Sequence, residues 1–286
     1  MPELPEVETT RAGLAPHCVG RRVSDVIVHN GRLRWPVPEH LADVLTGRLV
    51  QRIERRGKYL LLYCLDEVSA HVGVLMVHLG MSGSLRLVDP GSVRKTHDHL
   101  VFSLSDAADD LDAEPRWELR YHDPRRFGCC LWLELPAEQH PLLASLGPEP
   151  LTDAFTDTHL FRLSRGKSMP IKSFLMDSQV VVGVGNIYAN EALFEVGIHP
   201  LREAGRISEK RYVALSVAVR AILANAIAQG GTTLRDFVNG QGEPGYFQQQ
   251  LSVYGRAGEP CLRCQKPLTE VRLSARSTVF CTRCQR

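Results

Sequence analysis

Four cysteines near the C-terminus have the spacing of a metal site. Cys261 and Cys264 form one C-x2-C pair, and Cys281 and Cys284 form a second pair after sixteen intervening residues. Each pair can hold a metal ion from a tight turn, and four thiolates complete a tetrahedral zinc site with no open position for water. Two disulfides or a redox pair are the alternatives for this spacing. The pattern predicts one structural Zn2+ that holds together a small module lacking its own core.

The rest of the composition points to an intracellular globular chain. The other four cysteines lie in apolar or strand-like surroundings and are predicted to be buried packing residues; they are Cys18, Cys64, Cys129 and Cys130. The N-terminus is acidic and lacks an apolar signal region, and no run of about 18 apolar residues is present. We therefore expect a cytoplasmic protein without a membrane span.

Charge is distributed unevenly along the chain. The 286 residues carry 34 Lys and Arg against 32 Asp and Glu, a net charge of +2. Residues 201–286 hold thirteen basic and six acidic residues, net +7, so the first 200, with twenty-one and twenty-six, are at −5. A basic C-terminal region suits the phosphate backbone of nucleic acid, and a solvated basic face is the alternative.

Periodicity predicts a β-rich first half and a helical second half. A short helix is expected over residues 3–15. Short apolar segments separated by Gly, Asp and Pro turns favour an antiparallel sandwich or barrel. These predicted strands are 23–29, 59–65, 72–78, 84–88, 100–104, 117–121 and 129–133. The predicted helices are 156–164, 171–177, 187–196 and 208–228.

Three connecting segments have distinct compositions. A proline-rich linker is predicted over 136–153, and a mobile glycine-rich loop over 230–245. The acidic stretch 106–114 reads as a solvated loop away from any DNA. The glycine turn that ends at Asn186 enters a helix and offers backbone N–H groups to an anion, although close helix packing explains the glycines equally well.

Seven segments, in order along the whole chain, together resemble bacterial formamidopyrimidine-DNA glycosylases. Besides the four-cysteine finger, the segments are residues 2–8 (PELPEVE), 55–59, 78–84, 123–128, 182–188 and 253–256. The resemblance implies a bifunctional, monomeric repair enzyme. It would remove 8-oxoguanine and formamidopyrimidines from double-stranded DNA and then cut the abasic strand.

The resemblance also implies the fold class, an α+β chain of several domains. We expect an N-terminal antiparallel β-sandwich with flanking helices over 1–135 and the linker at 136–153. A helix-two-turn-helix domain with a lesion loop would follow over 154–245, and a β-hairpin zinc finger over 250–286.

The N-terminal segment is expected to carry the nucleophile. Removal of the initiator Met would leave Pro2 with a secondary amine at the chain end. An α-amino group has a pKa of about 8, so part of this amine would be neutral at pH 7. The resemblance implies that this amine attacks C1′ of the damaged nucleotide and that Glu3 is the general acid. Glu3 would need a raised pKa, from burial or from Glu6 one helical turn away. Alternatively, Glu6 is a helix N-terminal carboxylate favoured by the helix dipole.

Further residues match the family's phosphate contacts. Lys58 corresponds to a lysine that contacts the lesion phosphate and assists β-elimination, where the alternative is a solvated strand-edge lysine. Arg276, on the finger hairpin, corresponds to a second phosphate clamp and proton donor for δ-elimination. Zinc would fix the hairpin so that this guanidinium meets the phosphate. Asn186 corresponds to a further phosphate ligand.

Three residues match side chains that fill the gap left in the DNA duplex when a nucleotide is flipped out. Met81 is an adaptable thioether, Arg125 can hydrogen-bond the orphaned base, and Phe127 is an aromatic wedge. Without the resemblance, Met81 and Phe127 would be read as core residues. DNA-contacting positions of the family also fall on His97, Arg125 and Lys167. His78 is either a phosphate contact or a structural histidine.

Two other functions compete with this one. Endonuclease VIII shares the N-terminal proline, the lysine and the finger but prefers oxidised pyrimidines; Leu4 and the Arg125–Phe127 pair favour the purine enzyme. The second is a catalytically silent zinc-finger protein that binds damaged DNA. The intact Pro2 and Glu3 argue against it.

Overall fold

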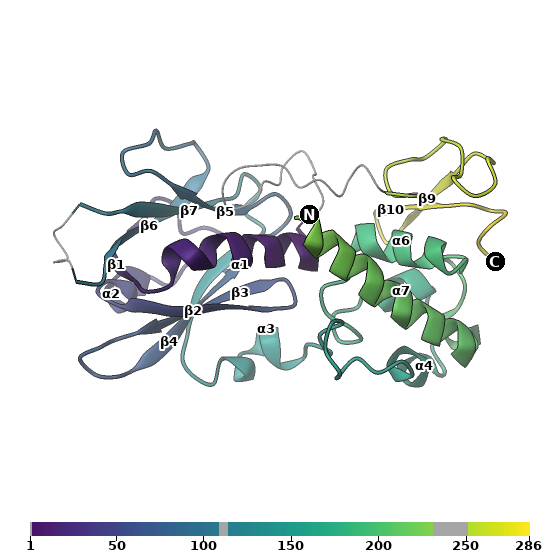
Figure 1. The fold of residues 1–286 in the computed structure, drawn as a ribbon, viewed down its shortest axis with the longest axis horizontal. Helices are drawn as coiled ribbons and strands as arrows, with labels where there is room; N and C mark the ends of the chain where they lie inside the picture. Colours follow the sequence, from purple (N-terminus) through teal and green to yellow (C-terminus); the bar gives the residue numbers. More distant parts are fainter. Residues whose placement is uncertain (1, 109–113, 231–250) are drawn as a thin grey trace. The chain divides into compact units, whose positions relative to one another are not determined.

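A computed structural model describes residues 2–108, 114–230 and 251–286 (Figure 1). The chain divides into two compact units. The first, here the β unit, contains Pro2 and Glu6–Ala144. The second, the helical unit, contains Glu3–Pro5, Ser145–Gln229 and the described part of Phe247–Arg286. The predicted loop 230–245 lies outside the described residues except for Gly230, as does 109–113 of the acidic stretch.

The β unit is built on one eight-stranded antiparallel sheet. Its strand order is β5-β7-β6-β1-β2-β3-β4-β8. The strands are β1 (Arg21–Val28), β2 (Leu49–Arg56), β3 (Tyr59–Leu65), β4 (Val72–His78), β5 (Ser84–Val88), β6 (Asp98–Asp106), β7 (Trp117–His122) and β8 (Cys129–Leu133). The helices are α1 (Leu4–Cys18), whose first two residues belong to the helical unit, α2 (Leu41–Leu45), η1 (Ala137–Gln139) and α3 (Pro141–Ala144).

The sheet folds into two halves around one core. Strands β1 and β2, which join the halves, share the single register pair Arg22↔Leu49. In Figure 1, β5–β7 and β2–β4 lie on opposite sides of α1. Buried side chains of α1, α2 and both halves form one cluster, in which alternate β3 residues such as Leu60 and Leu62 take part. The predicted antiparallel architecture is thereby confirmed, its two layers being halves of one sheet.

The sequence-based prediction missed β2 and several short helical segments, among them α2, η1 and α3. A register shift between Val50 and Arg52 breaks the alternation of buried and exposed residues along β2, so the strand has no clean two-residue period. Helix α2 is too short to show helical periodicity. The segment predicted as a plain linker, 136–153, contains η1 and α3.

The helical unit packs around its longest helix. It contains α4 (His159–Ser164), α5 (Ile171–Leu175), α6 (Asn186–Glu195), η2 (Ala204–Arg206), α7 (Glu209–Ala228), β9 (Thr269–Leu273) and β10 (Arg276–Phe280). Helix α7 is long and apolar enough to cross a membrane by length and composition. Its buried face, including Tyr212, Leu215 and Leu223, marks it instead as the core helix of this unit.

Candidate functional site

The carboxylate of Glu3 is buried at the N-terminus of α6. It accepts hydrogen bonds from the backbone N–H groups of Gly185 (2.8 Å), Ile187 (2.9 Å) and Tyr188 (3.4 Å), and the residue is 1% exposed. The N–H of Leu4 donates to the carbonyl of Gly183, at 3.1 Å. The glycine turn was predicted to offer N–H groups to an anion, and in this structure that anion is Glu3. These donors stabilise the ionised carboxylate, whereas the sequence suggested burial and Glu6 as the influences on Glu3.

Pro2 and Glu6 belong to the β unit. Pro2 is buried, and Met1 lies outside the described residues. Glu6 is 2% exposed and occupies the first turn of α1, where a carboxylate is favoured by the helix dipole. Its backbone carbonyl accepts a hydrogen bond from the Thr10 hydroxyl, at 2.8 Å.

Lys58 lies in a two-residue hairpin turn between β2 and β3. Gly57, at φ 57°, supplies the positive φ that such a turn requires. The next residue, Tyr59, pairs with His78 across β3 and β4, with the two rings 4.8 Å apart.

His78 is held as a neutral imidazole. Burial, followed by the charges of Lys58 and Arg34, lowers its pKa from 6.5 to about 4. Its Nδ1 accepts the N–H of Gly80 at 3.0 Å, which requires that nitrogen to be unprotonated. The structural alternative for His78 is favoured over a phosphate contact.

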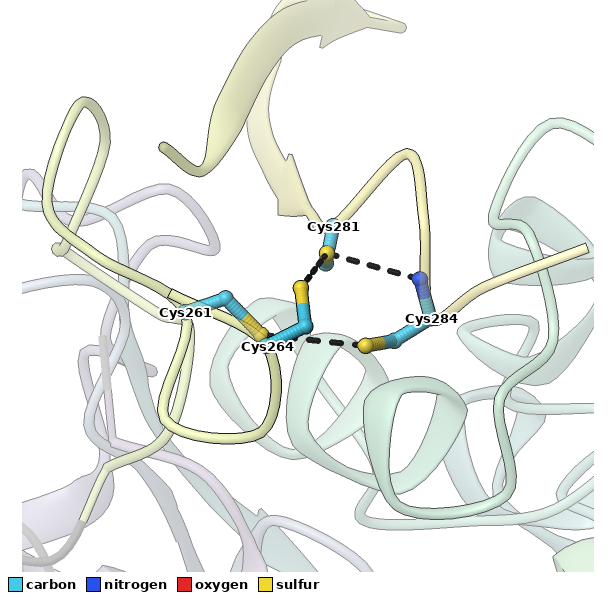
Figure 2. A group of neighbouring side chains, drawn as sticks. All are labelled: Cys261, Cys264, Cys281 and Cys284. Atoms are coloured by element: carbon cyan, nitrogen blue, oxygen red, sulfur yellow. Dashed lines mark hydrogen bonds between the residues drawn. The ribbon is translucent and has the colours of Figure 1, made fainter. Parts of the chain in front are cut away.

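The four predicted ligand cysteines converge in the finger (Figure 2). Their sulfur atoms all lie within 4.8 Å of one another, with Cys264 and Cys281 at 3.4 Å and Cys261 and Cys284 at 3.9 Å. A tetrahedral zinc ion with Zn–S bonds of about 2.3 Å places its sulfurs roughly 3.8 Å apart. The geometry therefore fits one structural zinc ion. The four remaining cysteines are buried, as predicted.

Arg276 is the first residue of β10 and is exposed, directly after the β9–β10 turn. Strand β10, which carries Arg276, is held to α5 by a lysine that the sequence analysis did not single out. Lys172 on α5 donates from Nζ to the carbonyl of Ser277 (2.8 Å) and to Thr278 Oγ1 (2.7 Å). Asn190 on α6 adds a bond, because its Oδ1 accepts the N–H of Val279 at 3.1 Å.

The finger shares its core with α6. Phe194 of α6 forms one buried cluster with Val253, Leu268, Val279 and two ligand cysteines. Buried Glu191, also on α6, accepts the backbone N–H groups of residues 252–254 at 2.8–2.9 Å. The sequence carries no signal for these contacts of Glu191, since an isolated glutamate in a helix is ordinarily solvated.

The predicted wedge residues lie on two loops of the β unit. Met81 is 39% exposed and Phe127 is 43% exposed, so the alternative reading of both as core residues is wrong. The guanidinium carbon of Arg125 lies 4.8 Å from the centre of the Phe127 ring. His97 is exposed beside the rings of His99 and His122.

Two of the predicted DNA contacts lie in the helical unit. Lys167 is exposed, and its carbonyl accepts the N–H of Gly205 at 2.8 Å. Asn186 is the first residue of α6, and its Oδ1 is buried without a hydrogen-bond partner among the described residues.

Comparisons with known proteins agree along the whole chain. Residues 1–130 match the formamidopyrimidine-DNA glycosylase N-terminal domain, 146–238 the H2TH domain of the same enzymes, and 258–286 the zinc finger found in FPG and IleRS. Formamidopyrimidine-DNA glycosylases of Methylococcus capsulatus and Marinobacter nauticus are 58% and 56% identical over 100% of both chains.

Solved structures agree as well. The MutM (Fpg) protein of Thermus thermophilus has a TM-score of 0.86 at 36% identity, covering 99% of this chain and 98% of that one. Lactococcus lactis Fpg in complex with DNA containing an abasic site has a TM-score of 0.88 at 33% identity, covering 99% of both chains. With these matches from the first residue to the last, the chain belongs to the formamidopyrimidine-DNA glycosylase family.

Proposed function

We propose that this DNA glycosylase removes oxidised purines from double-stranded DNA through a Schiff base at Pro2 and then cuts the abasic strand by β,δ-elimination. The observation that carries the proposal is the position of Glu3, which is buried and next in sequence to Pro2, with its carboxyl group at the N-terminus of α6. A relative from Lactococcus lactis is known in complex with DNA containing N7-benzyl-Fapy-dG. The enzyme would act in the bacterial cytoplasm, associated with the nucleoid when bound to DNA.

The first step needs a free secondary amine. After removal of Met1, the lone pair of the Pro2 nitrogen attacks C1′, and the bond between C1′ and the base breaks with its electrons going to the base, which takes up the proton that the nitrogen loses. Opening of the sugar ring then forms the charged iminium while O4′ takes a proton. Glu3 would deliver that proton, so its carboxyl group must gain one in the DNA complex.

Strand cleavage follows from the charge of the iminium. It acidifies the C2′ hydrogen, and loss of that proton expels the 3′ phosphate; a second elimination expels the 5′ phosphate. Lys58 and Arg276 would bind these phosphates and supply the needed positive charge. The four-cysteine site, when it binds zinc, fixes the hairpin that carries Arg276.

Borohydride trapping tests this function. Wild-type protein incubated with duplex DNA containing 8-oxoguanine and then reduced should give a covalent protein–DNA adduct. Pro2→Gly should lose most of the adduct while retaining DNA binding. Pro90→Gly, at an exposed loop position, is the matched control and should behave as wild type. An undiminished adduct in Pro2→Gly would relocate the nucleophile, and no adduct in wild type would favour the silent DNA-binding protein.

Substrate preference separates the purine enzyme from an endonuclease VIII-like activity. Wild-type excision rates should be compared for 8-oxoguanine opposite cytosine and for thymine glycol in the same duplex. A relative from Lactococcus lactis is known in complex with DNA containing an oxidised pyrimidine, so the comparison must be quantitative. We expect the higher kcat/KM for 8-oxoguanine; the reverse order would contradict the proposed substrate class.

A further inference from the structure

Two loops of the β unit cross from one half of the sheet to the other. The β4–β5 loop carries Met81, and the β7–β8 loop carries Arg125 and Phe127. Their backbones meet at two glycines. A Cβ on Gly80 would lie 2.6 Å from the backbone nitrogen of Gly128, and a Cβ on Gly128 would lie 2.0 Å from the Tyr121 hydroxyl. The loops therefore approach too closely for a side chain at either position.

A buried carboxylate lies at this crossing. Asp123 is 0% exposed; its Oδ2 accepts the N–H of Gly128 at 2.9 Å, and its Oδ1 accepts the N–H of Arg125 at 3.3 Å. The hydroxyl of buried Tyr121 lies 3.2 Å from the same Oδ2 and 3.0 Å from the carbonyl of His78, where β4 ends. One carboxylate and one hydroxyl thus connect the β7–β8 loop to the end of β4.

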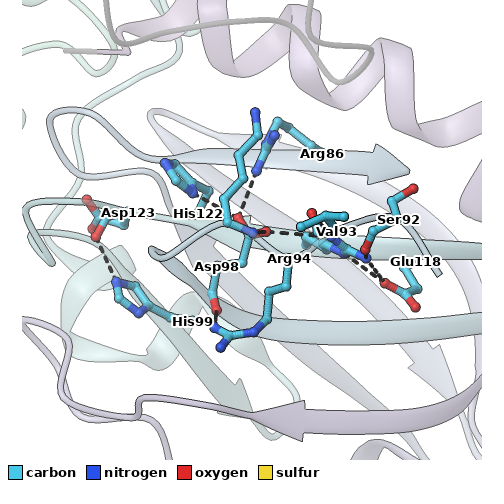
Figure 3. A network of polar contacts seen from close by, with 11 residues as sticks. Arg86, Ser92, Val93, Arg94, Asp98, His99, Glu118, His122 and Asp123 are labelled. Carbon is cyan, nitrogen blue, oxygen red and sulfur yellow. Dashed lines mark hydrogen bonds and ion pairs between the residues drawn. The ribbon is translucent and has the colours of Figure 1, made fainter. Parts of the chain in front are cut away.

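A third segment is tied to the same residue (Figure 3). The backbone N–H of Asp123 donates to the carbonyl of His97 at 3.0 Å, and His99 Nε2 lies 2.8 Å from the Asp123 carbonyl. Asp98 lies between His97 and His99 in the sequence. Its Oδ1 is 2.8 Å from the Arg86 guanidinium and 2.8 Å from His122 Nδ1. Asp123 therefore contacts its own loop, which carries Arg125 and Phe127, and the segment that carries His97, while the Tyr121 hydroxyl links it to His78 at the start of the loop that carries Met81.

We propose that Asp123 and Tyr121 are positioning residues that fix the spacing of Met81 from Arg125 and Phe127, so that the three side chains enter the duplex as one rigid wedge. This rests on the proposed function, in which these side chains fill the gap left by the flipped nucleotide. Being buried, Asp123 and Tyr121 act through the loops and not by touching DNA. The alternative is that the pair only stabilises the fold, which would affect every substrate alike.

Two conservative variants test the proposal. Tyr121→Phe removes the hydroxyl and keeps the ring, and Asp123→Asn keeps the shape but replaces one acceptor oxygen with a donor. Asp25→Asn, exposed on β1, makes the same chemical change away from the loops and is the control. Each protein is compared on duplex DNA containing 8-oxoguanine and on single-stranded DNA containing an abasic site, which has no base stack to penetrate. Fluorescence of 2-aminopurine placed opposite the lesion reports insertion directly.

We expect both variants to lower kcat on the duplex by about tenfold or more, because small misplacements of a positioned group are costly. Their 2-aminopurine response should fall in parallel, while cleavage of the single strand stays within about twofold of wild type. Equal losses on both substrates, or duplex activity equal to that of Asp25→Asn, would overturn the proposal. If Asp123→Asn does not fold, Tyr121→Phe decides alone. Inactivity of the wild-type protein on both substrates would instead contradict the proposed function.

Discussion

The carboxyl group of Glu3 occupies the space that a side chain at Gly185 would need. A Cβ on Gly185 would lie 2.3 Å from Glu3 Cδ and 2.5 and 2.7 Å from its two oxygens. Glycine at this position is therefore required by a carboxylate 182 residues earlier in the chain, and not by a positive φ, since its φ is −120°.

Gly185→Ala should displace Glu3 from its three N–H donors. We expect a loss of about 1–3 kcal/mol in the free energy of unfolding, because buried polar groups lose their partners. Excision of 8-oxoguanine should fall by about tenfold or more. The control is Gly13→Ala in α1, where a Cβ meets nothing within 4 Å. That change should stabilise the protein by up to about 1 kcal/mol. Equal excision by the two variants would show that Glu3 tolerates displacement.

Lys172→Met should loosen the strand that carries Arg276. The substitution leaves the Ser277 carbonyl and the Thr278 hydroxyl without their lysine donor, at a cost of about 1–3 kcal/mol in unfolding free energy. Strand cleavage should slow more than base excision, because Arg276 is proposed to act on the phosphate. Lys210→Met, at an exposed position on α7, is the control. Parallel losses of excision and cleavage would contradict this assignment.

Acid should destabilise the β unit through His78. Its pKa is lowered to about 4 in the folded protein from 6.5, so the unfolded chain binds more protons between these values. Stability is therefore complete above about pH 6.5 and falls as the pH drops toward 4, by roughly 2 kcal/mol once the partial exposure of the ring is allowed for. Thermal unfolding across this range measures the effect.

The matched variants for this prediction are His78→Asn and His40→Asn. In His78→Asn the amide oxygen would still accept the Gly80 N–H but would not titrate, so the acid dependence should flatten. His40 is exposed, and its replacement should leave the wild-type slope unchanged. An unaltered slope in His78→Asn would assign the acid sensitivity to other groups.

Cys281→Ser should release zinc and abolish DNA binding while the β unit stays folded. Structural zinc contributes directly to the folding of small domains, and this finger is proposed to carry a phosphate contact. Zinc content by elemental analysis, duplex affinity and circular dichroism measure the three effects. Cys18→Ala, in the β unit, should keep its zinc. DNA binding that survives zinc loss would contradict the role given to the finger.

Features that depend on short local patterns could be predicted from the sequence. Each recognisable pattern occupies only a few consecutive residues. Examples are each C-x2-C pair, the apolar run of Tyr59–Leu65 and the motif around Gly185. The architecture and the position of the cysteine ligands followed from these patterns.

Partners contributed by distant elements could not be predicted in this way. A lysine such as Lys172 is ordinarily solvated, and nothing near it in sequence reveals the carbonyl that it binds 105 residues later. Asp123 stood inside a recognised motif, yet its link to His78 depends on two strands from different halves of the sheet. Burial of Glu3 was one of the two influences that the sequence suggested, but the N–H donors around its carboxylate were not predicted.

The shared core of the finger limits how it can be used in protein engineering. Phe194, which belongs to α6, closes the apolar cluster beneath the cysteines, and Arg263 stacks on the same ring with its guanidinium carbon 4.5 Å from the ring centre. A peptide containing only residues 251–286 would keep the four cysteine ligands but lose the packing against Phe194. The finger therefore cannot be transferred to another DNA-binding scaffold by itself. A graft must include an equivalent of α6.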